Sequence, residues 1–312
     1  MSLCLVTGGA GFIGSHIVRR LLEQGRSVRV LDDFSTGKRQ NLAEVAAQIE
    51  LVEGSICDPA TVAQAMRGVE VVFHLAARAS VPRSVAEPRP CNEINVTGTL
   101  NLLIAARDVG ARRFVYSASS SAYGDTPVMP KKPDMRPQPL SPYAVSKLAA
   151  EHYCTCWSHV YGLQTACLRY FNVFGPRQDP HGAYAAVIPA FVSRMLKGQP
   201  PVVYGDGEQS RDFCFIENVV NANMLAAEAP ELHGEVVNIA CGERTTLNAI
   251  VKDINTLLGT NVQPKYEPAR AGDVRHSLAD LSDAKRVLGY EPKIMFSEGL
   301  RRSIDWYRAN LT

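Results

Sequence analysis

Short apolar runs recur along the first half of the chain, and each is followed by a segment in which apolar residues return every three or four positions. Runs of this length are typical of buried strands, and the longer periodic segments are typical of amphipathic helices. Because strands alternate with helices, the sequence predicts an α/β protein with a doubly wound, largely parallel sheet. The strands are predicted at residues 3–6, 28–31, 50–53, 69–74, 113–117 and 165–170.

The pattern changes after residue 175, where Pro, Gly and Tyr become frequent and the segments shorten. We expect this part to form a smaller C-terminal α/β lobe. Residues 217–229 have a helical pattern, and the run at 235–240 is predicted to be a strand that returns to the main sheet. The predicted division is a first domain of residues 1–172, with residues 217–242 returning to it, and a lobe of residues 173–216 and 243–312.

A glycine-rich turn joins the first strand to the first helix, with glycines at positions 8, 11 and 14. The second strand ends at Asp32, about where a dinucleotide site needs an acid. Glycines let the backbone approach a pyrophosphate closely, and the helix N-terminus offers unpaired N–H groups to it. Asp32 would accept hydrogen bonds from ribose hydroxyls and repel a 2′-phosphate, so the sequence favours NAD over NADP.

A second signal is the stretch from Ser141 to Lys147, which places a phenol four residues before an ammonium group. If Pro142 opens a helix, Tyr143 and Lys147 lie one turn apart on the same face. A nearby cation favours the phenolate, so Tyr143 could exchange a proton although its ordinary pKa is about 10. Such a pair arises often by chance, and its weight comes from the dinucleotide turn upstream. Together they predict a general acid/base beside a redox cofactor.

The spacing Gly8-x-x-Gly11-x-x-Gly14, followed by Tyr143-x-x-x-Lys147, resembles the short-chain dehydrogenase/reductase superfamily in its extended branch of nucleotide-sugar enzymes. The resemblance spans essentially the whole chain. It implies a Rossmann sheet with a C-terminal substrate lobe, NAD as cofactor and a UDP-sugar as substrate. The further matching stretches are residues 74–77, 95–99, 119–124 and 169–176.

The resemblance also implies site residues. Tyr143 removes the proton of a sugar hydroxyl, Ser119 hydrogen-bonds the same oxygen, and Lys147 stabilises the phenolate. The implied cofactor contacts are Gly8, Gly11, Phe12, Ile13, Gly14, Asp32, Asp33, Ser35, Thr36, Gly37, Ser55, Ile56, Leu75, Ala76, Ala77, Asn95, Tyr143, Lys147, Tyr170 and Val173. The implied substrate contacts are Ser80, Ser119, Ser120, Ser121, Tyr143, Asn172, Ala186, Val187, Tyr204, Arg211, Arg270, Asp273 and Ser277.

Local differences separate the activities of this branch. The 4,6-dehydratases carry an Asp-Glu pair after a Thr, where this chain has Ser119, Ser120 and Ser121. The reductases of the branch usually take NADP, against which Asp32 argues. The remaining expectation is an NAD-dependent UDP-hexose 4-epimerase. A UDP-glucuronate 4-epimerase is the alternative, and a non-catalytic NAD-binding regulator is disfavoured because Tyr143 and Lys147 are both retained.

By the same resemblance, Arg211 and Arg270 contact the pyrophosphate of the substrate, Asp273 the uridine ribose, and Asn172 the sugar–phosphate end. Ser277 occupies a position that is a bulky Tyr in bacterial 4-epimerases restricted to UDP-glucose. A small residue there leaves room for a 2-acetamido group, so we expect UDP-N-acetylglucosamine and UDP-N-acetylgalactosamine to be accepted. The alternative is that Ser277 only fills a loop and that UDP-glucose and UDP-galactose bind equally well.

One position departs from the family pattern. Ser55 stands where the family commonly has an Asp that contacts the adenine amino group. Ser55 can still accept a hydrogen bond, although without charge. The sequence leaves two outcomes open, a lower affinity for the cofactor or substitution by Asp58.

Composition adds limits rather than chemistry. The formal charge is +2 with no basic or acidic block, so neither nucleic acid nor a membrane surface is an expected partner. No apolar run approaches the roughly 20 residues needed to span a bilayer, and the first strand begins too early to leave room for a signal peptide. The eight Cys are scattered, so we expect buried free thiols, a cytoplasmic location and no metal site.

Three smaller expectations complete the interpretation. His74 is predicted to pack at a strand end, and the adjacent Lys131 and Lys132 to form solvated surface. Relatives pair through the helix that bears Tyr143 and the one after Asn95, so the resemblance also implies a homodimer.

Overall fold

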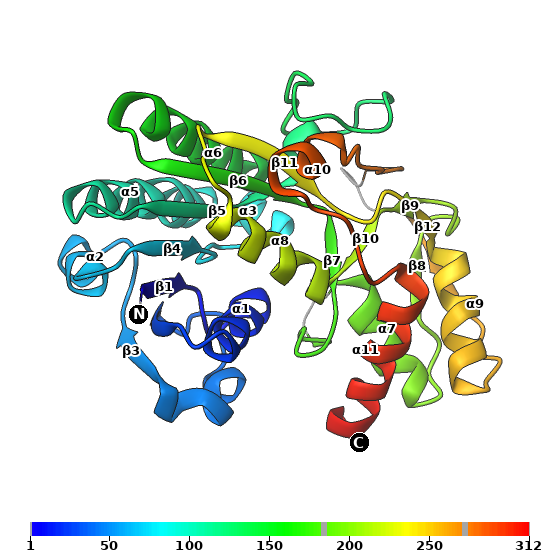
Figure 1. Cartoon of the computed structure of the whole chain (residues 1–312). Helices are drawn as coiled ribbons and strands as arrows, with labels where there is room; N and C mark the ends of the chain where they lie inside the picture. The colour runs from blue at the N-terminus through cyan, green and yellow to red at the C-terminus, as the bar shows by residue number, and fades with distance from the viewer. Residues whose placement is uncertain (1, 182–185, 270–273, 312) are drawn as a thin grey trace.

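A seven-stranded parallel sheet forms the centre of the protein in the computed structural model, which describes residues 2–181, 186–269 and 274–311 (Figure 1). The strand order is β3-β2-β1-β4-β5-β6-β11, and every neighbouring pair is parallel. This is the order of a doubly wound sheet, as predicted. The strands are β1 (Leu3–Thr7), β2 (Ser27–Asp32), β3 (Ile49–Glu53), β4 (Val71–His74), β5 (Arg113–Ser119), β6 (Gln164–Tyr170) and β11 (Glu235–Ile239).

Burial on both faces explains why these strands were visible as continuous apolar runs. Leu5 and Val6 are adjacent in β1, point to opposite faces and are both fully buried. The boundaries differ from the prediction by one or two residues. The largest consequence is at β5, which continues through Ser119, so Ser119 is the last residue of the strand and does not follow it.

Helices cover both faces of the sheet (Figure 1). Helices α1 (Phe12–Glu23) and α8 (Ile216–Glu228) pack on one face. Helices α2 (Pro59–Met66), α5 (Gly98–Asp108) and α6 (Pro142–Tyr161) pack on the other. Each face has its own apolar cluster, which holds α1 on one face and α6 on the other. The N-termini of both helices lie toward the carboxyl ends of the strands, where ligands bind in such sheets.

Four short segments connect β4 to α5 and β5 to α6. They are α3 (Val81–Ala86), α4 (Pro88–Asn92), a π-helical turn (Glu93–Thr97) that runs directly into α5, and a 3-10 turn (Ser120–Tyr123). A longer 3-10 segment, Arg39–Gln48, lies between β2 and β3.

The smaller lobe packs onto the α8 side of the sheet, and its apolar residues belong to the same cluster as those beneath α1 and α8. Phe174, Phe213 and Phe296 meet there with ring centroids 5.6–6.2 Å apart. Its three small sheets pair β7 with β10, β9 with β12 and β8 with β13. The elements are β7 (Asn172–Phe174), α7 (Val187–Leu196), β8 (Val202–Tyr204), β9 (Ser210–Arg211), β10 (Phe213–Phe215), β12 (Thr245–Thr246), α9 (Leu247–Leu258), β13 (Lys265–Glu267), α10 (Ser282–Leu288) and α11 (Phe296–Leu311).

The prediction for Lys131 is wrong. Only Lys132 is exposed, whereas Lys131 is 1% exposed. The backbone of Lys131 bonds on both sides to a distant segment, donating to Leu278 O at 2.8 Å and accepting from Asp280 N at 2.9 Å. Its ammonium group donates to the Thr126 carbonyl, and burial lowers its pKa. A non-local strand-like contact therefore buries a residue whose local sequence is typical of a surface loop.

The thiols are all free, but only six of the eight are buried. Cys57 is half-buried and Cys156 is exposed on α6. Within the described residues, no helix is both long and apolar enough to cross a membrane.

Candidate active site

The turn after β1 is built so that backbone, not side chain, faces a ligand. Gly8 has φ +68°, and a Cβ there would lie 2.7 Å from Ala76 N. A Cβ on Gly14 would lie 2.2 Å from the Gly8 carbonyl oxygen. Helix α1, which starts with Phe12 and Ile13, has neither a side-chain cap nor an acidic residue in its first turn. Its N-terminal N–H groups are therefore available to a pyrophosphate, so the turn fits a dinucleotide.

Asp32 is the last residue of β2 and is buried. Its two carboxylate oxygens accept from Ala10 N at 2.8 Å and from Phe34 N at 2.9 Å. Burial raises the pKa of this carboxyl, and those two hydrogen bonds oppose the rise. Each oxygen keeps a further lone pair, so Asp32 can still accept from ribose hydroxyls.

The loop after β2 lies close to that carboxylate. A Cβ on Gly37 would lie 2.8 Å from Asp32 Oδ1, so glycine is needed for this close approach. Asp33 is exposed and accepts from both the amide and the hydroxyl of Ser35, at 2.9 and 2.6 Å. Thr36 is also exposed. These residues form the polar rim of the predicted adenosine end.

Ser55 and Asp58, the two candidates for the adenine contact, both accept hydrogen bonds from nearby backbone amides. Ser55 Oγ accepts from Cys57 N at 3.2 Å. Asp58 caps α2, accepting from Ala60 N and Thr61 N at 3.2 and 3.1 Å. Ile56 is buried and packs against Gly98 of α5. The carboxylate of Asp58 already accepts from the N-terminus of α2. Asp58 is therefore a poor substitute for the Asp that the family commonly has at position 55.

Residues Leu75, Ala76 and Ala77 follow β4 and are half-buried at the same sheet edge. Thr7 Oγ1 accepts from the amides of Leu75 and Ala76 at 3.2 Å and lies 2.7 Å from His74 Nδ1. The other ring nitrogen of His74 lies 2.8 Å from Thr99 Oγ1. His74 is thus fully buried and bonded on both sides, as expected for a packing residue.

The carboxamide of Asn95 is used as an internal brace. Asn95 lies in the π-helical turn and is buried. Its Oδ1 accepts from Arg78 N at 2.7 Å, and its Nδ2 donates to Ser146 Oγ at 2.9 Å. Tyr170 is similar, because its hydroxyl lies 3.0 and 2.8 Å from the carboxamide O and N of Asn223 on α8. Val173 O accepts from Gln178 Nε2 at 3.1 Å.

The structure brings Tyr143, Ser119 and Lys147 together. Tyr143 is in the first turn of α6, and its phenol lies beside the Ser119 side chain at the end of β5. Ser119 Oγ also lies 2.8 Å from Ser121 Oγ in the following turn, beside Ser120. Lys147 is 4% exposed, and its ammonium nitrogen lies 3.5 Å from Ser117 Oγ.

Burial decides the protonation of this group in the chain alone. It raises the pKa of the Tyr143 phenol, and the nearby Ser119 side chain only partly opposes the rise. It lowers the pKa of Lys147 to about 8, although the ammonium group also lies 4.4 Å from the centre of the Tyr116 ring. Burial therefore outweighs the other influences on the Tyr143 phenol, and it moves the pKa in the direction opposite to the one that a neighbouring cation would favour.

A buried ion pair beneath this group was missed. Glu151, one turn after Lys147 on α6, accepts from Arg169 Nε and Nη2 at 2.9 and 2.7 Å. The side chains of Arg169 and Glu151 are 3% and 2% exposed. Glu151 was not among the predicted residues, and no local signal in the sequence identifies Arg169 on β6 as its partner.

On the lobe side, Asn172 and Ser277 meet although they are 105 residues apart. Asn172 Nδ2 lies 3.5 Å from Ser277 Oγ and 3.4 Å from the Asp212 carbonyl. Ser277 N donates to Ser210 O at 3.1 Å. The small side chain of Ser277 is half-buried beside an amide that is available for a polar ligand.

Asp212 joins its own segment to residues 241–242 and to residue 279, and its role was also missed. Its carboxylate accepts from the amides of Cys241, Gly242 and Ala279 at 2.9, 3.0 and 3.1 Å. Asp212 is fully buried, and this burial raises its pKa to about 6. The neighbouring Arg211 donates to the carbonyls of Ser210 and Arg275 at 3.0 and 2.9 Å.

The other predicted substrate residues lie around this region on separate elements. Ser80 caps α3 and accepts from Arg83 N at 3.3 Å. Ala186 is exposed and precedes α7, which begins at Val187. Tyr204 ends β8, and its carbonyl accepts from Gln209 Nε2 at 2.5 Å. Arg270 and Asp273 lie outside the described residues.

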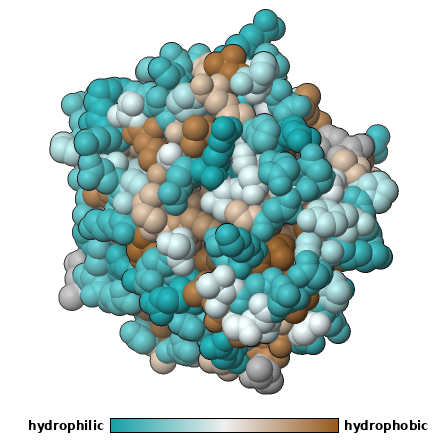
Figure 2. All heavy atoms as spheres, turned by 90° about the vertical axis from the view of Figure 1, so that its right-hand side faces the viewer, coloured by the Kyte–Doolittle hydropathy of each residue, from teal (hydrophilic) through white to brown (hydrophobic). Residues whose placement is uncertain are grey.

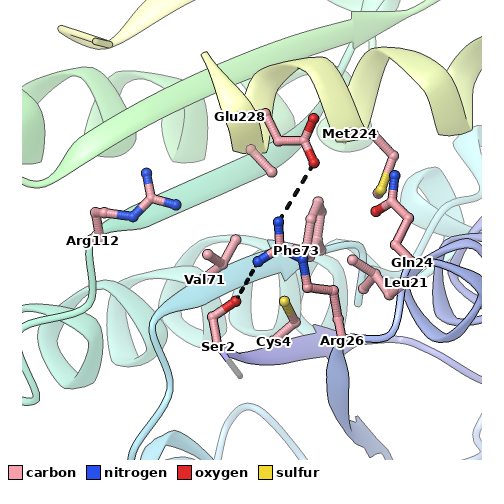
Figure 3. Close-up of a pocket in the computed structure, with 11 residues that line it drawn as sticks. Ser2, Cys4, Leu21, Gln24, Arg26, Val71, Phe73, Arg112, Met224 and Glu228 are labelled. Atoms are coloured by element: carbon pink, nitrogen blue, oxygen red, sulfur yellow. Dashed lines mark hydrogen bonds and ion pairs between the residues drawn. The ribbon is translucent and has the colours of Figure 1, made fainter. Parts of the chain in front are cut away.

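A cavity at the amino ends of the strands is distinct from this site, which lies at their carboxyl ends (Figure 3). It holds about 280 Å³ of space, including its opening to solvent. Its floor is apolar, with Cys4 and Phe73, and Arg26 lies at its rim, where it bonds Ser2 Oγ at 2.7 Å and pairs with Glu228 at 3.6 Å. None of the predicted site residues lines it.

The geometry therefore defines a dinucleotide-dependent enzyme with a Tyr–Lys–Ser group. Residues 4–240 match the family model "NAD dependent epimerase/dehydratase family". The UDP-glucose 4-epimerase of Mycolicibacterium smegmatis is 40% identical over 308 residues, which cover 97% of this chain and 98% of that protein.

Two solved structures are each 41% identical to this chain in sequence. The UDP-glucose 4-epimerase of Thermotoga maritima, with UDP-glucose, has a TM-score of 0.95 and 41% identity, covering 99% of this chain and 100% of that one. The UDP-N-acetylglucosamine 4-epimerase of Methanobrevibacter ruminantium, in complex with UDP-N-acetylmuramic acid, has a TM-score of 0.94 and 41% identity, covering 99% and 98%. The chain belongs to the NAD-dependent epimerase/dehydratase family, in its branch of UDP-sugar 4-epimerases, and its cofactor is NAD.

Proposed function

We propose that the protein interconverts the C4 epimers of UDP-hexoses and accepts the N-acetylated pair, UDP-N-acetylglucosamine and UDP-N-acetylgalactosamine. The observation that carries the chemistry is the position of the Tyr143 phenol beside the Ser119 side chain at the carboxyl ends of the strands, with Lys147 one turn along α6. The observation that carries the substrate range is the small Ser277 beside Asn172.

In this proposal, Tyr143 takes the proton of the 4-hydroxyl and Ser119 hydrogen-bonds the same oxygen. Lys147, whose pKa is about 8, is mostly protonated at neutral pH and stabilises the phenolate as it forms. The turn at Gly8 and Gly14, together with Asp32, would hold NAD, which would accept the C4 hydride and later return it. After the 4-keto sugar has turned over, Tyr143 returns the proton.

The raised pKa of Tyr143 fits such a cycle. A phenol that keeps its proton in the chain alone is not a permanent base, and it loses the proton only when other positive charge is near. Lys147 supplies one such charge from the protein. Tyr143 can then act as base in one half of the cycle and as acid in the other.

Substrate range rests on the lobe. A 2-acetamido group needs space and a polar partner, and the Ser277–Asn172 contact provides a small side chain next to a carboxamide. The two solved relatives at 41% identity divide between UDP-glucose and N-acetylated ligands, so identity alone does not favour either sugar.

The test is incubation of the purified protein and NAD with five UDP-sugars, those of glucose, galactose, N-acetylglucosamine, N-acetylgalactosamine and glucuronic acid, with products resolved by NMR. We expect both acetylated sugars to be converted. Ser277→Tyr should abolish their conversion and retain that of UDP-glucose, because the larger ring fills the space beside Asn172. Conversion of the uronic acid alone would contradict the proposal and favour the alternative, with Ser119–Ser121 contacting its carboxylate.

We also propose a homodimer formed through α5 and α6. These helices expose Ile104, Tyr153 and Tyr161, and the two tyrosines flank Trp157 with ring centroids 6.0 and 4.9 Å from it. On the face that carries α9, apolar side chains appear only in small groups among hydrophilic ones (Figure 2). Light scattering should give the mass of a dimer for the native protein and of a monomer for Ile104→Glu, because the added charge would be buried at the interface.

A further inference from the structure

Helix α6 presents Tyr143 from its first turn, where backbone N–H groups lack partners within the helix. Ser141 caps the helix and accepts from Ala144 N at 3.1 Å. Pro142, at the first position, has no N–H group to satisfy. The remaining N–H is that of Tyr143 itself, and its partner comes from another element.

That partner is Ser84 of α3. Tyr143 N donates to Ser84 Oγ at 3.1 Å. Ser84 is 0% exposed, and its hydroxyl donates to Val81 O at 2.7 Å, which orients the oxygen lone pairs toward α6. Ser84 is the buried residue of α3, while Val81 and Val85 are exposed. Its position is thus better explained by the bond to Tyr143 than by apolar packing.

The carbonyl of the same residue is held from the other side. Ser146 Oγ donates to Tyr143 O at 2.8 Å. Ser146 in turn accepts from Asn95 Nδ2 at 2.9 Å, and Asn95 is fixed by Arg78 N. The backbone of Tyr143 is therefore bonded at both polar atoms, directly by Ser84 of α3 at its N–H and by Ser146 of α6 at its carbonyl, and Asn95 of the π-helical turn braces Ser146.

We infer that Ser84 is a positioning residue for the acid/base Tyr143. It fixes the start of α6 relative to α3, whose cap, Ser80, lies among the predicted substrate contacts. This inference rests on the proposed function of Tyr143. A shift of about 1 Å in a reacting group can cost about 100-fold in rate, so a single hydrogen bond at the base of the phenol is large enough to matter.

The test compares Ser84→Ala with Ser303→Ala. Ser303 is equally buried, on α11, and donates only to Gly299 O of its own helix at 2.7 Å. Both variants lose a buried hydroxyl, but only Ser84→Ala leaves Tyr143 N without its acceptor. We expect kcat on the converted UDP-sugar to fall about 10- to 100-fold in Ser84→Ala with KM little changed, and to stay native in Ser303→Ala.

Two further measurements sharpen the result. Deuterium at C4 of the sugar should slow Ser84→Ala more than the native enzyme, because a misplaced phenol makes the chemical step limiting. Ser84→Thr, which keeps the hydroxyl, should recover much of kcat. If Ser84→Ala does not fold, Ser84→Cys takes its place, since the thiol nearly preserves volume but accepts hydrogen bonds weakly.

If the native enzyme is active and a folded Ser84→Ala or Ser84→Cys variant has an unchanged kcat, the inference about Ser84 is overturned and the proposed function still stands. Equal losses of kcat in Ser84→Ala and Ser303→Ala would do the same. A native protein inactive on every UDP-sugar would instead overturn the proposed function.

Discussion

Replacing Glu151 by Gln tests whether the buried ion pair under α6 is as consequential as its burial indicates. Removing one member of a buried pair costs roughly 3–5 kcal/mol, because the other charge stays uncompensated. Arg169 would keep its bond to Pro133 O at 3.3 Å and its position 4.7 Å from the Tyr123 ring centre. Gln would also keep one carbonyl oxygen as acceptor. We therefore expect the low end, a loss of about 3 kcal/mol in the free energy of unfolding.

Urea unfolding followed by tryptophan fluorescence measures this loss, since Trp157, one of two tryptophans, lies on the same helix. Glu291→Gln is the control. It breaks an ion pair to Lys285 whose side chains are 69% and 64% exposed, and it should leave the midpoint unchanged within error. The double variant Glu151→Met and Arg169→Met should recover most of the loss, because neither member of the pair is left as an uncompensated charge. A loss below about 1 kcal/mol for Glu151→Gln would refute the reasoning, since that is the range of exposed pairs.

Three other outcomes follow from burial and close contact. Urea midpoints should show that the stability of the native chain relative to Lys147→Met rises between about pH 8 and pH 10.5. The pKa of Lys147 is about 8 in the folded chain and about 10.5 in the unfolded chain, so in that window the unfolded chain keeps a proton on Lys147 that the folded chain has lost. A flat difference would contradict this. Gly14→Ala should weaken NAD binding by at least about tenfold in calorimetry, because its Cβ would lie 2.2 Å from Gly8 O, whereas Gly25→Ala, with no atom within 4 Å, should not. Tyr143→Phe should lower kcat about 10²- to 10⁴-fold with NAD still bound, and unchanged turnover would count against the acid/base role.

The parts of the fold that could be predicted are those with a local physical cause. Residues such as Leu5 and Val6 must be apolar on both faces of a covered parallel strand, so the strand appears as an unbroken run. The turn at Gly8 and Gly14 was visible because side chains there would meet backbone atoms. The pair Tyr143 and Lys147 was visible because helical spacing alone puts them on one face.

The parts that could not be predicted depend on partners far away in the sequence. Ser84 looks like any helix serine until Tyr143 N is found 3.1 Å from it. Arg169 and Glu151 are ordinary charged residues until the fold buries both. Lys131 was predicted to be solvated because a Lys-Lys pair after Pro130 is typical of surface loops, and only its contact with residues 278–280 buries it.

The acid/base group and the sugar-selecting residues are held by separate networks, and this separation has a measurable consequence. Tyr143 is fixed through Ser84 and Ser146 on the sheet side. Ser277 is fixed through Ser210 O and Asn172 on the lobe side, and no hydrogen bond among the described residues joins it directly to Tyr143. Substitutions at sites without shared partners usually add. The effects of Ser84→Ala and Ser277→Tyr on kcat/KM for UDP-glucose should therefore multiply within error in the double variant, and a clear departure would show that the two networks are coupled.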